Sequence, residues 1–187
     1  MDVQTMFQCA VAEFGARVSQ VSDVQWAAGT PDQEWTVRDL VNHVVSEDLW
    51  APPLFAGSTV SEVGSRFGGD VLGADPKRSW QTASAEAIRA AAEPGVMDRT
   101  VHLSFGDFPG REYAMQLFAD HLIHAWDLAR AIGAGEQLDA GLVGDCTAWF
   151  ANIEGAYRSG GAIAERPPIP EDAGPQVRLL AMFGRRA

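Results

Sequence analysis

Apolar side chains recur at intervals of three and four residues along most of this chain, a spacing that predicts amphipathic helices. The first such pattern covers residues 2–20, and a second begins after Thr36 and runs to the prolines at 52 and 53. Thr36 can cap this second helix, with Asp39 placing an acidic group in its first turn. Because a proline ring clashes with the preceding helical turn, we expect the two prolines to end or kink the helix.

The remaining apolar patterns predict further helices over residues 79–92, 111–132, 140–157 and 175–183. Residues 56–78 are rich in Gly, Ser and Asp and are expected to form a long loop with one short helical piece. Residues 100–105 alternate between apolar and polar, which is typical of a short strand or an extended connector, and a turn is expected over 106–110.

Four substantial helices with a long crossover between the second and the third predict an all-α fold, a four-helix bundle with an added C-terminal helix. Gly133 directly follows the longest pattern and is a typical C-terminal stop. The length of 187 residues suits one domain, so we expect residues 1–187 to fold as a unit.

The charge and the cysteine content of the chain indicate which partners and which cellular compartment are expected. The chain has 14 basic and 25 acidic residues, a formal net charge of -11, which argues against nucleic acid and anionic membrane as partners. Cys9 and Cys146 show no motif spacing and are interpreted as two buried thiols in a reducing compartment. The N-terminus lacks the basic and apolar regions of a signal peptide, so we expect a cytoplasmic protein, either a monomer or a homodimer.

Motifs of common enzyme classes are missing from the sequence. There is no GxSxG, P-loop, GxGxxG or HExxH pattern, and the glycine-rich run 64–69 lacks the lysine of a phosphate-binding loop. A cysteine–histidine nucleophile pair is left open, although neither cysteine has a charged neighbour that would lower its pKa.

Histidine and aspartate spacing in the longest predicted helix points to metal chemistry. At about 100° per residue, Asp120 and His124 lie roughly 40° apart and one turn apart, so both side chains can reach one ion. Asp127 could accept a hydrogen bond from the other ring nitrogen of His124. His121 points away from Asp120, and His43 on the second predicted helix is the candidate third ligand.

Several alternatives stay open at this point. The arc that carries Asp120 and His124 could simply face water, although the stretch 113–129 has no Lys, Arg or Glu. His43 could equally be a hydrogen-bonded histidine at a helix boundary, and Glu47 could substitute for it or add to it. His102, in the alternating segment, is expected to pack or form a hydrogen bond rather than bind metal.

Three segments together resemble a known family. Trp35-Thr-Val-Arg-Asp-Leu-Val-Asn-His43 resembles the tryptophan-to-histidine segment of the DinB-like superfamily, in its mycothiol-dependent maleylpyruvate isomerase branch. Asp120-x-x-x-His124-Ala-Trp-Asp127 resembles the helix of that branch that carries an acid-xxx-His pair followed by an aspartate. The ending, residues 177–186, is similar to that of small uncharacterised actinobacterial members.

The resemblance implies a four-helix bundle with a divalent metal at one end of its core, bound by His43, Asp120 and His124. Zinc is the metal it favours, with nickel or iron as further possibilities, and mycothiol is the implied thiol cofactor. Aspartate stands at position 120 where the family has glutamate, which shortens the reach by one methylene. A short helix is expected where the isomerase has a further C-terminal domain, so we expect an activity other than maleylpyruvate isomerisation.

The leading hypothesis is therefore a metal-dependent enzyme that acts with a low-molecular-weight thiol on an electrophile, by S-transfer or thiol-assisted isomerisation. His121, Asp127 and Glu47 are candidates for handling protons, with no assignment among them. A second hypothesis is a non-catalytic protein that binds a metal or a small ligand. A third is a helical interaction module whose His and Asp residues face solvent.

Overall fold

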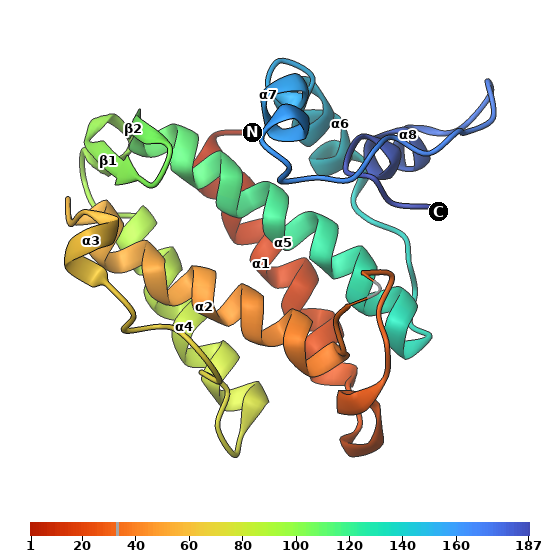
Figure 1. Ribbon diagram of the computed structural model, residues 1–187, viewed down its shortest axis with the longest axis horizontal. Helices are drawn as coiled ribbons and strands as arrows, with labels where there is room; N and C mark the ends of the chain where they lie inside the picture. Colours follow the sequence, from red (N-terminus) through yellow and green to blue (C-terminus); the bar gives the residue numbers. More distant parts are fainter. Residues whose placement is uncertain (33) are drawn as a thin grey trace.

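The described part of the chain folds as a bundle of four long helices, with a two-stranded hairpin and four shorter helices around it (Figure 1). The computed structural model describes residues 1–32 and 34–187. The four long helices are α1 (Val3–Gln20), α2 (Val37–Phe55), α4 (Pro76–Ala91) and α5 (Gly110–Ile132). Helix α1 packs against α5 and α4, and α2 packs against the same two helices, so the predicted all-α four-helix bundle is confirmed.

The long crossover between α2 and α4 contains one short helix, α3 (Val60–Val63), as expected. Helix α4 begins three residues earlier than predicted, because the Asp75 side chain caps it and Pro76 occupies its first position. Short 3-10 helices cover Asp23–Ala27 and Val96–Asp98. Helix α5 ends at Gly133, whose φ of 70° is the left-handed conformation of a C-terminal stop, as predicted.

Three sequence predictions of local structure are wrong in detail. The first concerns Pro52 and Pro53, which do not end α2: the helix continues to Phe55, and the carbonyls of both prolines accept bonds from Ala56 and Ser58. Each proline lacks the N–H that would donate to the carbonyl four residues earlier, and α2 ends two residues after Pro53.

The second difference lies in the alternating segment. Residues 106–110 were predicted as a turn, but Gly106–Pro109 is a strand, β2, which pairs antiparallel with β1 (Thr100–Leu103). The true turn is at Ser104 and Phe105, so the strand alternative for this segment is confirmed as a hairpin.

The third difference is a break in the helix predicted over 140–157. It forms as α6 (Ala140–Phe150) and α7 (Glu154–Ser159), separated by a turn in which the Asn152 amide bonds back to the carbonyl of Ala148. Side-chain amides that bond to the backbone compete with helix continuation. The break brings Tyr157 edge-on against Phe150. The C-terminal helix, α8 (Pro175–Met182), forms as expected.

The hydrophobic core continues from the bundle into these added helices. Helix α5 is buried along nearly its whole length because α1, α2, α6 and the hairpin surround it. Phe183, after α8, stacks on Phe150 of α6 with ring centres 3.9 Å apart. Figure 1 shows α6, α7 and α8 gathered together beside α5. Among the described residues, no helix combines the length and apolarity that crossing a membrane requires.

Gly110 is a position where the fold requires the absence of a side chain. A Cβ there would lie 2.1 Å from the carbonyl oxygen of Val96, and backbone cannot yield as a side-chain tip can. We expect Gly110→Ala to destabilise the protein by about 1–3 kcal/mol through this overpacking. The matched control is Gly144→Ala inside α6, where a Cβ meets nothing within 4 Å. It should stabilise by roughly 0.5–1 kcal/mol. Urea unfolding of both variants checks the opposite signs, and equal stability would contradict the prediction.

Candidate metal centre

The site is built from one turn of α5 and the first half of α2. Asp120 and His124 are one turn apart on α5, and Asp120 Oδ1 lies 3.4 Å from His124 Nε2. His43 projects from α2, with its Nε2 3.3 Å from the same Asp120 oxygen. The N-terminus of α2 is fixed by Thr36 and Asp39, which form the predicted reciprocal cap. The geometry of helix α5 thus places Asp120 next to His124, and the packing of α2 against α5 places His43 next to both.

The three side chains offer ligand atoms that all lie within 4.8 Å of one another. Ligands bound at about 2.0–2.1 Å in a tetrahedral arrangement are roughly 3.3–3.4 Å apart. The two measured separations from Asp120 Oδ1, 3.3 and 3.4 Å, agree with that spacing. The other carboxylate oxygen, Asp120 Oδ2, is buried and has no hydrogen-bond partner among the residues that the structure describes. Two imidazoles and a carboxylate with a free buried oxygen are a donor set that fits a divalent metal ion.

Hydrogen bonds behind the cluster orient His124. Its Nδ1 lies 3.0 Å from Asp127 Oδ2, so Nδ1 carries the proton donated to Asp127 and Nε2 faces Asp120. Asp127 is fully buried and also accepts from the Arg185 guanidinium, with 2.7 Å between Nη2 and Oδ2. The arc of α5 that carries His124 and Asp127 is therefore buried, and the hypothesis that it faces water is wrong.

The charges in the cluster are strongly interdependent. Burial by itself raises the pKa of Asp120, but His43 and then His124 outweigh burial and hold this pKa well below its usual value. Burial lowers the pKa of His124, but Asp120 and Asp127 more than compensate and raise it to about 9. Two carboxylates thus favour positive charge on His124 in the metal-free protein.

An aromatic wall encloses the centre. The Trp35 ring lies 4.9 Å from the His43 ring and 5.8 Å from the His124 ring, measured between centres. The segment before Trp35 is held by a bridge between Gly29 and Thr36. Trp35 therefore forms one wall of the site.

The remaining histidines do not join the cluster. His121 is fully buried, donates from Nδ1 to the Leu117 carbonyl at 2.8 Å and places Nε2 3.3 Å from Asp48 Oδ1. Burial raises the pKa of Asp48, whereas Asp48 outweighs burial and raises the pKa of His121. His102 forms a 2.7 Å hydrogen bond with Asp107 in the hairpin, as predicted.

Glu47 is half-buried, one turn after His43 on α2. Burial, followed by the negative charge of Asp120, raises the pKa of Glu47. The prediction of two buried thiols is confirmed for Cys146 and wrong for Cys9, which is only half-buried. Burial raises the pKa of Cys146 to about 12, which argues against a thiolate nucleophile there.

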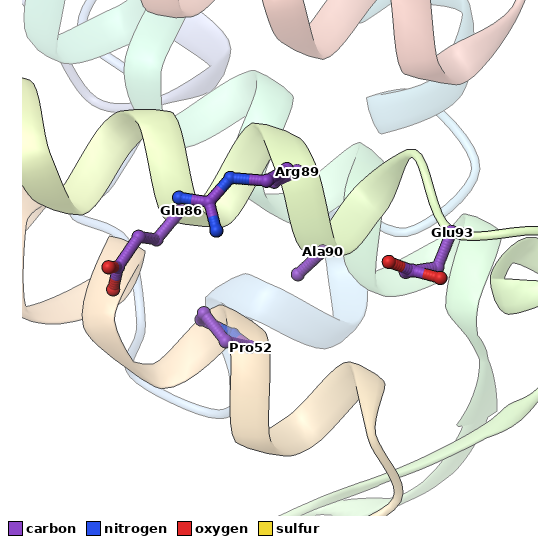
Figure 2. Close-up of a pocket in the computed structure, with 5 residues that line it drawn as sticks. All are labelled: Pro52, Glu86, Arg89, Ala90 and Glu93. Atoms are coloured by element: carbon purple, nitrogen blue, oxygen red, sulfur yellow. The ribbon is translucent and has the colours of Figure 1, made fainter.

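Two cavities differ in their relation to the centre. A cavity of about 390 Å³ lies between α2 and α4, and none of the three candidate ligands lines it. Figure 2 shows the residues that line it, Pro52, Glu86, Arg89, Ala90 and Glu93. A larger cavity of about 660 Å³ has lining from residues 29–32 and 34, from Arg130 near the end of α5, and from Arg185. Arg185 also bonds to Asp127, so the larger cavity adjoins the groups behind the metal centre.

Two participants were missed by sequence reasoning, Asp48 and Arg185. Asp48 lies within the apolar pattern of α2, and its position between Val45 and Leu49 was an available sign of a buried carboxylate. Arg185 follows the last helix in an ordinary Gly-Arg-Arg ending, and nothing local distinguishes it from Arg186. Only the docking of α8 reveals its contact with Asp127.

A comparison with known protein families matches the part of the chain that contains the three candidate ligands. The sequence profile described as the mycothiol maleylpyruvate isomerase N-terminal domain matches residues 7–129, from α1 to the last turn of α5. Two uncharacterised proteins, from two strains of Mycobacterium tuberculosis, are each 32% identical over 191 residues, covering 99% of this chain and 98% of theirs. No solved structure matches the chain significantly.

Proposed function

We propose that this chain, which belongs to the mycothiol maleylpyruvate isomerase N-terminal domain family, is a metal-dependent enzyme that uses a low-molecular-weight thiol. The observation that carries the proposal is the cluster of His43, Asp120 and His124, whose ligand atoms lie within 4.8 Å of one another. These three residues would hold a divalent ion; the family resemblance favours zinc, and the donor set is equally compatible with iron or nickel.

A divalent ion bound by three protein ligands keeps an open position at which a thiol would be deprotonated and so activated as a nucleophile. The chain's own residues supply the surroundings. Trp35 limits access of water to the rings of His43 and His124, and Asp127 keeps the His124 ring turned with Nε2 toward Asp120. The half-buried Glu47 stands beside this centre as a candidate proton carrier, since burial and Asp120 raise its pKa.

The cavity of about 660 Å³ next to Arg185 is the proposed place for the organic part of the thiol or its electrophilic partner. Its volume falls in the range of small-molecule sites. Its lining mixes Arg130 and Arg185 with Asp32 and Glu34, so it suits a polar, hydroxyl-rich ligand better than a purely apolar one. Mycothiol, named in the family's description, is a thiol of this polar kind.

The first test is metal content. Protein purified without a polyhistidine tag should contain about one divalent ion per chain, measured by elemental analysis. Removing the ion with a chelator should lower Tm, because an ion present at 100 times its Kd stabilises the folded state by about 2.7 kcal/mol. A metal-free native protein whose Tm does not respond to zinc or to chelator would overturn the proposal.

The second test separates catalysis from binding. Conjugation of mycothiol to a chromogenic electrophile should be faster with the metal-loaded protein than with the stripped protein, and reloading with zinc should restore the rate. Stoichiometric metal together with no turnover across thiol-transfer and isomerisation assays would favour the alternative, a non-catalytic metal- or ligand-binding protein. That alternative rests on the same three ligands.

A further inference from the structure

We propose that Arg185, in the segment after α8, is a positioning residue of the metal centre: it fixes Asp127, which in turn holds the ring of His124. This inference rests on the proposed metal site and extends it to the C-terminal helices. The segment lies outside residues 7–129, where the family profile matches. The inference rests on two contacts in series: Arg185, after α8, contacts Asp127 on α5, and Asp127 contacts the candidate ligand His124.

The contact between Arg185 and Asp127 is two-pronged. Nη2 donates to Asp127 Oδ2 at 2.7 Å, and Nε lies 3.2 Å from both carboxylate oxygens. A guanidinium fork of this kind fixes both the position and the plane of a carboxylate. The Asp127 side chain is fully buried, and that of Arg185 is 17% exposed, so water competes little for either group.

The same Asp127 oxygen serves the metal ligand. Oδ2 accepts both from Arg185 and from Nδ1 of His124, which lies 3.0 Å away. A bond to Nδ1 sets the rotation of an imidazole ring and therefore the direction of its Nε2. Without Arg185, Asp127 would be a buried carboxylate with His124 as its remaining charged partner. The carboxylate would then be free to turn, and the ring would turn with it.

The chain around Arg185 is itself firmly placed. Its backbone N–H donates to the Leu180 carbonyl at 2.8 Å, and Gly184 before it has a φ of 78°, which suits glycine. Helix α8 is anchored by Leu179 and Leu180, neither of which has exposed surface, and Phe183 stacks on Phe150. The packing of α8 against α6 thus places the Arg185 guanidinium next to Asp127, on the side of His124 that faces away from Asp120.

A purely structural role for Arg185 is the competing explanation, in which its bond to Asp127 only docks α8. That role predicts lower stability without any change at His124. The two explanations are separated by three variants: Arg185→Gln, Arg185→Lys and the control Arg186→Gln. Arg186 is the adjacent residue, is exposed and has no hydrogen bond or ion pair within the described part of the chain. It also lines the larger cavity, so it is a control for the His124 ring and for zinc affinity and not for thiol binding.

The decisive measurement uses metal-free protein and ¹H–¹⁵N NMR of the histidine rings. In the wild type and in Arg186→Gln, the His124 Nδ1 proton should give a downfield, slowly exchanging resonance, because it is bonded to a buried carboxylate. In Arg185→Gln that resonance should be lost to exchange, and Arg185→Lys should restore it in part. Persistence of the resonance in Arg185→Gln, whatever happens to Tm, would overturn the inference.

Competition with a chromogenic chelator measures zinc affinity and shows whether loss of Arg185 weakens metal binding. Removing a group that orients a ligand costs 10–100-fold in metal affinity, so we expect Arg185→Gln to bind zinc about tenfold more weakly. Arg186→Gln should bind like the wild type. If wild-type protein shows the Arg185-dependent resonance but binds no zinc, the proposed metal function fails while the positioning of His124 stands. Unchanged zinc affinity in Arg185→Gln contradicts the proposed role.

Discussion

Replacing His124 by alanine will reduce the metal affinity of this protein more than 100-fold. Structural zinc held by four ligands is bound by about 10–16 kcal/mol, so one ligand contributes roughly 3 kcal/mol, which corresponds to a factor above 100. His124 is the best oriented of the three, because Asp127 holds its Nδ1 at 3.0 Å while Nε2 faces Asp120. Chelator competition with zinc on the purified variant measures the loss.

The matched control is His102→Ala. This residue is also a histidine bonded to an aspartate, but its partner is Asp107 in the exposed hairpin. Its removal should leave metal affinity within twofold of the wild type. The His124 change removes one basic partner from Asp120 and one from Asp127, which keep His43 and Arg185 respectively. Far-ultraviolet circular dichroism must therefore show that the variant is folded, and Asp120→Asn gives a second, milder test. Wild-type affinity in both folded variants would sink the assignment.

Replacing Asp48 by alanine will cost about 3–5 kcal/mol of folding free energy, the cost of removing one partner from a buried charged pair. Asp48 and His121 are both fully buried, with Nε2 and Oδ1 3.3 Å apart. Phe7 and Phe14 meet the His121 ring edge-on, so water cannot replace the lost carboxylate. The alanine also leaves a cavity, which adds to the loss.

The control is Asp48→Asn, which keeps the size of the side chain and therefore leaves no cavity. It also keeps an oxygen that can accept a hydrogen bond from His121, but it removes the charge, so we expect a loss that is smaller than that of the alanine variant. Urea unfolding followed by circular dichroism gives both values. Metal content per folded chain should be unchanged in both variants, since Asp48 is not among the three candidate ligands. A loss below about 1 kcal/mol for the alanine variant would show that the pair contributes little.

The two histidine–aspartate arrangements on α5 have different consequences. His121 is saturated, with the Leu117 carbonyl on one nitrogen and Asp48 on the other. His124 has Asp127 on one nitrogen and turns the other toward a carboxylate whose second oxygen has no partner. In both arrangements one buried carboxylate oxygen lacks a hydrogen-bond partner among the described residues, Asp48 Oδ1 in the first and Asp120 Oδ2 in the second. The second arrangement differs because His43 also approaches its carboxylate, so that three candidate ligands meet there.

Much of the fold followed from local pattern. The helices at residues 3–20, 37–55 and 110–132 were predicted because their apolar positions repeat with the helical period and their ends carry Thr36 and Gly133. The proline pair in α2, the turn that proved to be β2 and the break before α7 were misjudged. In each of these places a tertiary or capping contact outweighs a local propensity.

The sequence by itself determined the pairing of Asp120 with His124, because two residues four apart on a helix are brought together by the helix alone. It also nominated His43 as the third ligand, from its place on the second predicted helix and then from the family resemblance, but no spacing tied this residue to Asp120 and His124. Tertiary structure decided what the sequence could not. The approach of His43 to Asp120, of Asp48 to His121 and of Arg185 to Asp127 spans 77, 73 and 58 positions respectively. Such contacts depend on how whole helices pack, so no local period encodes them.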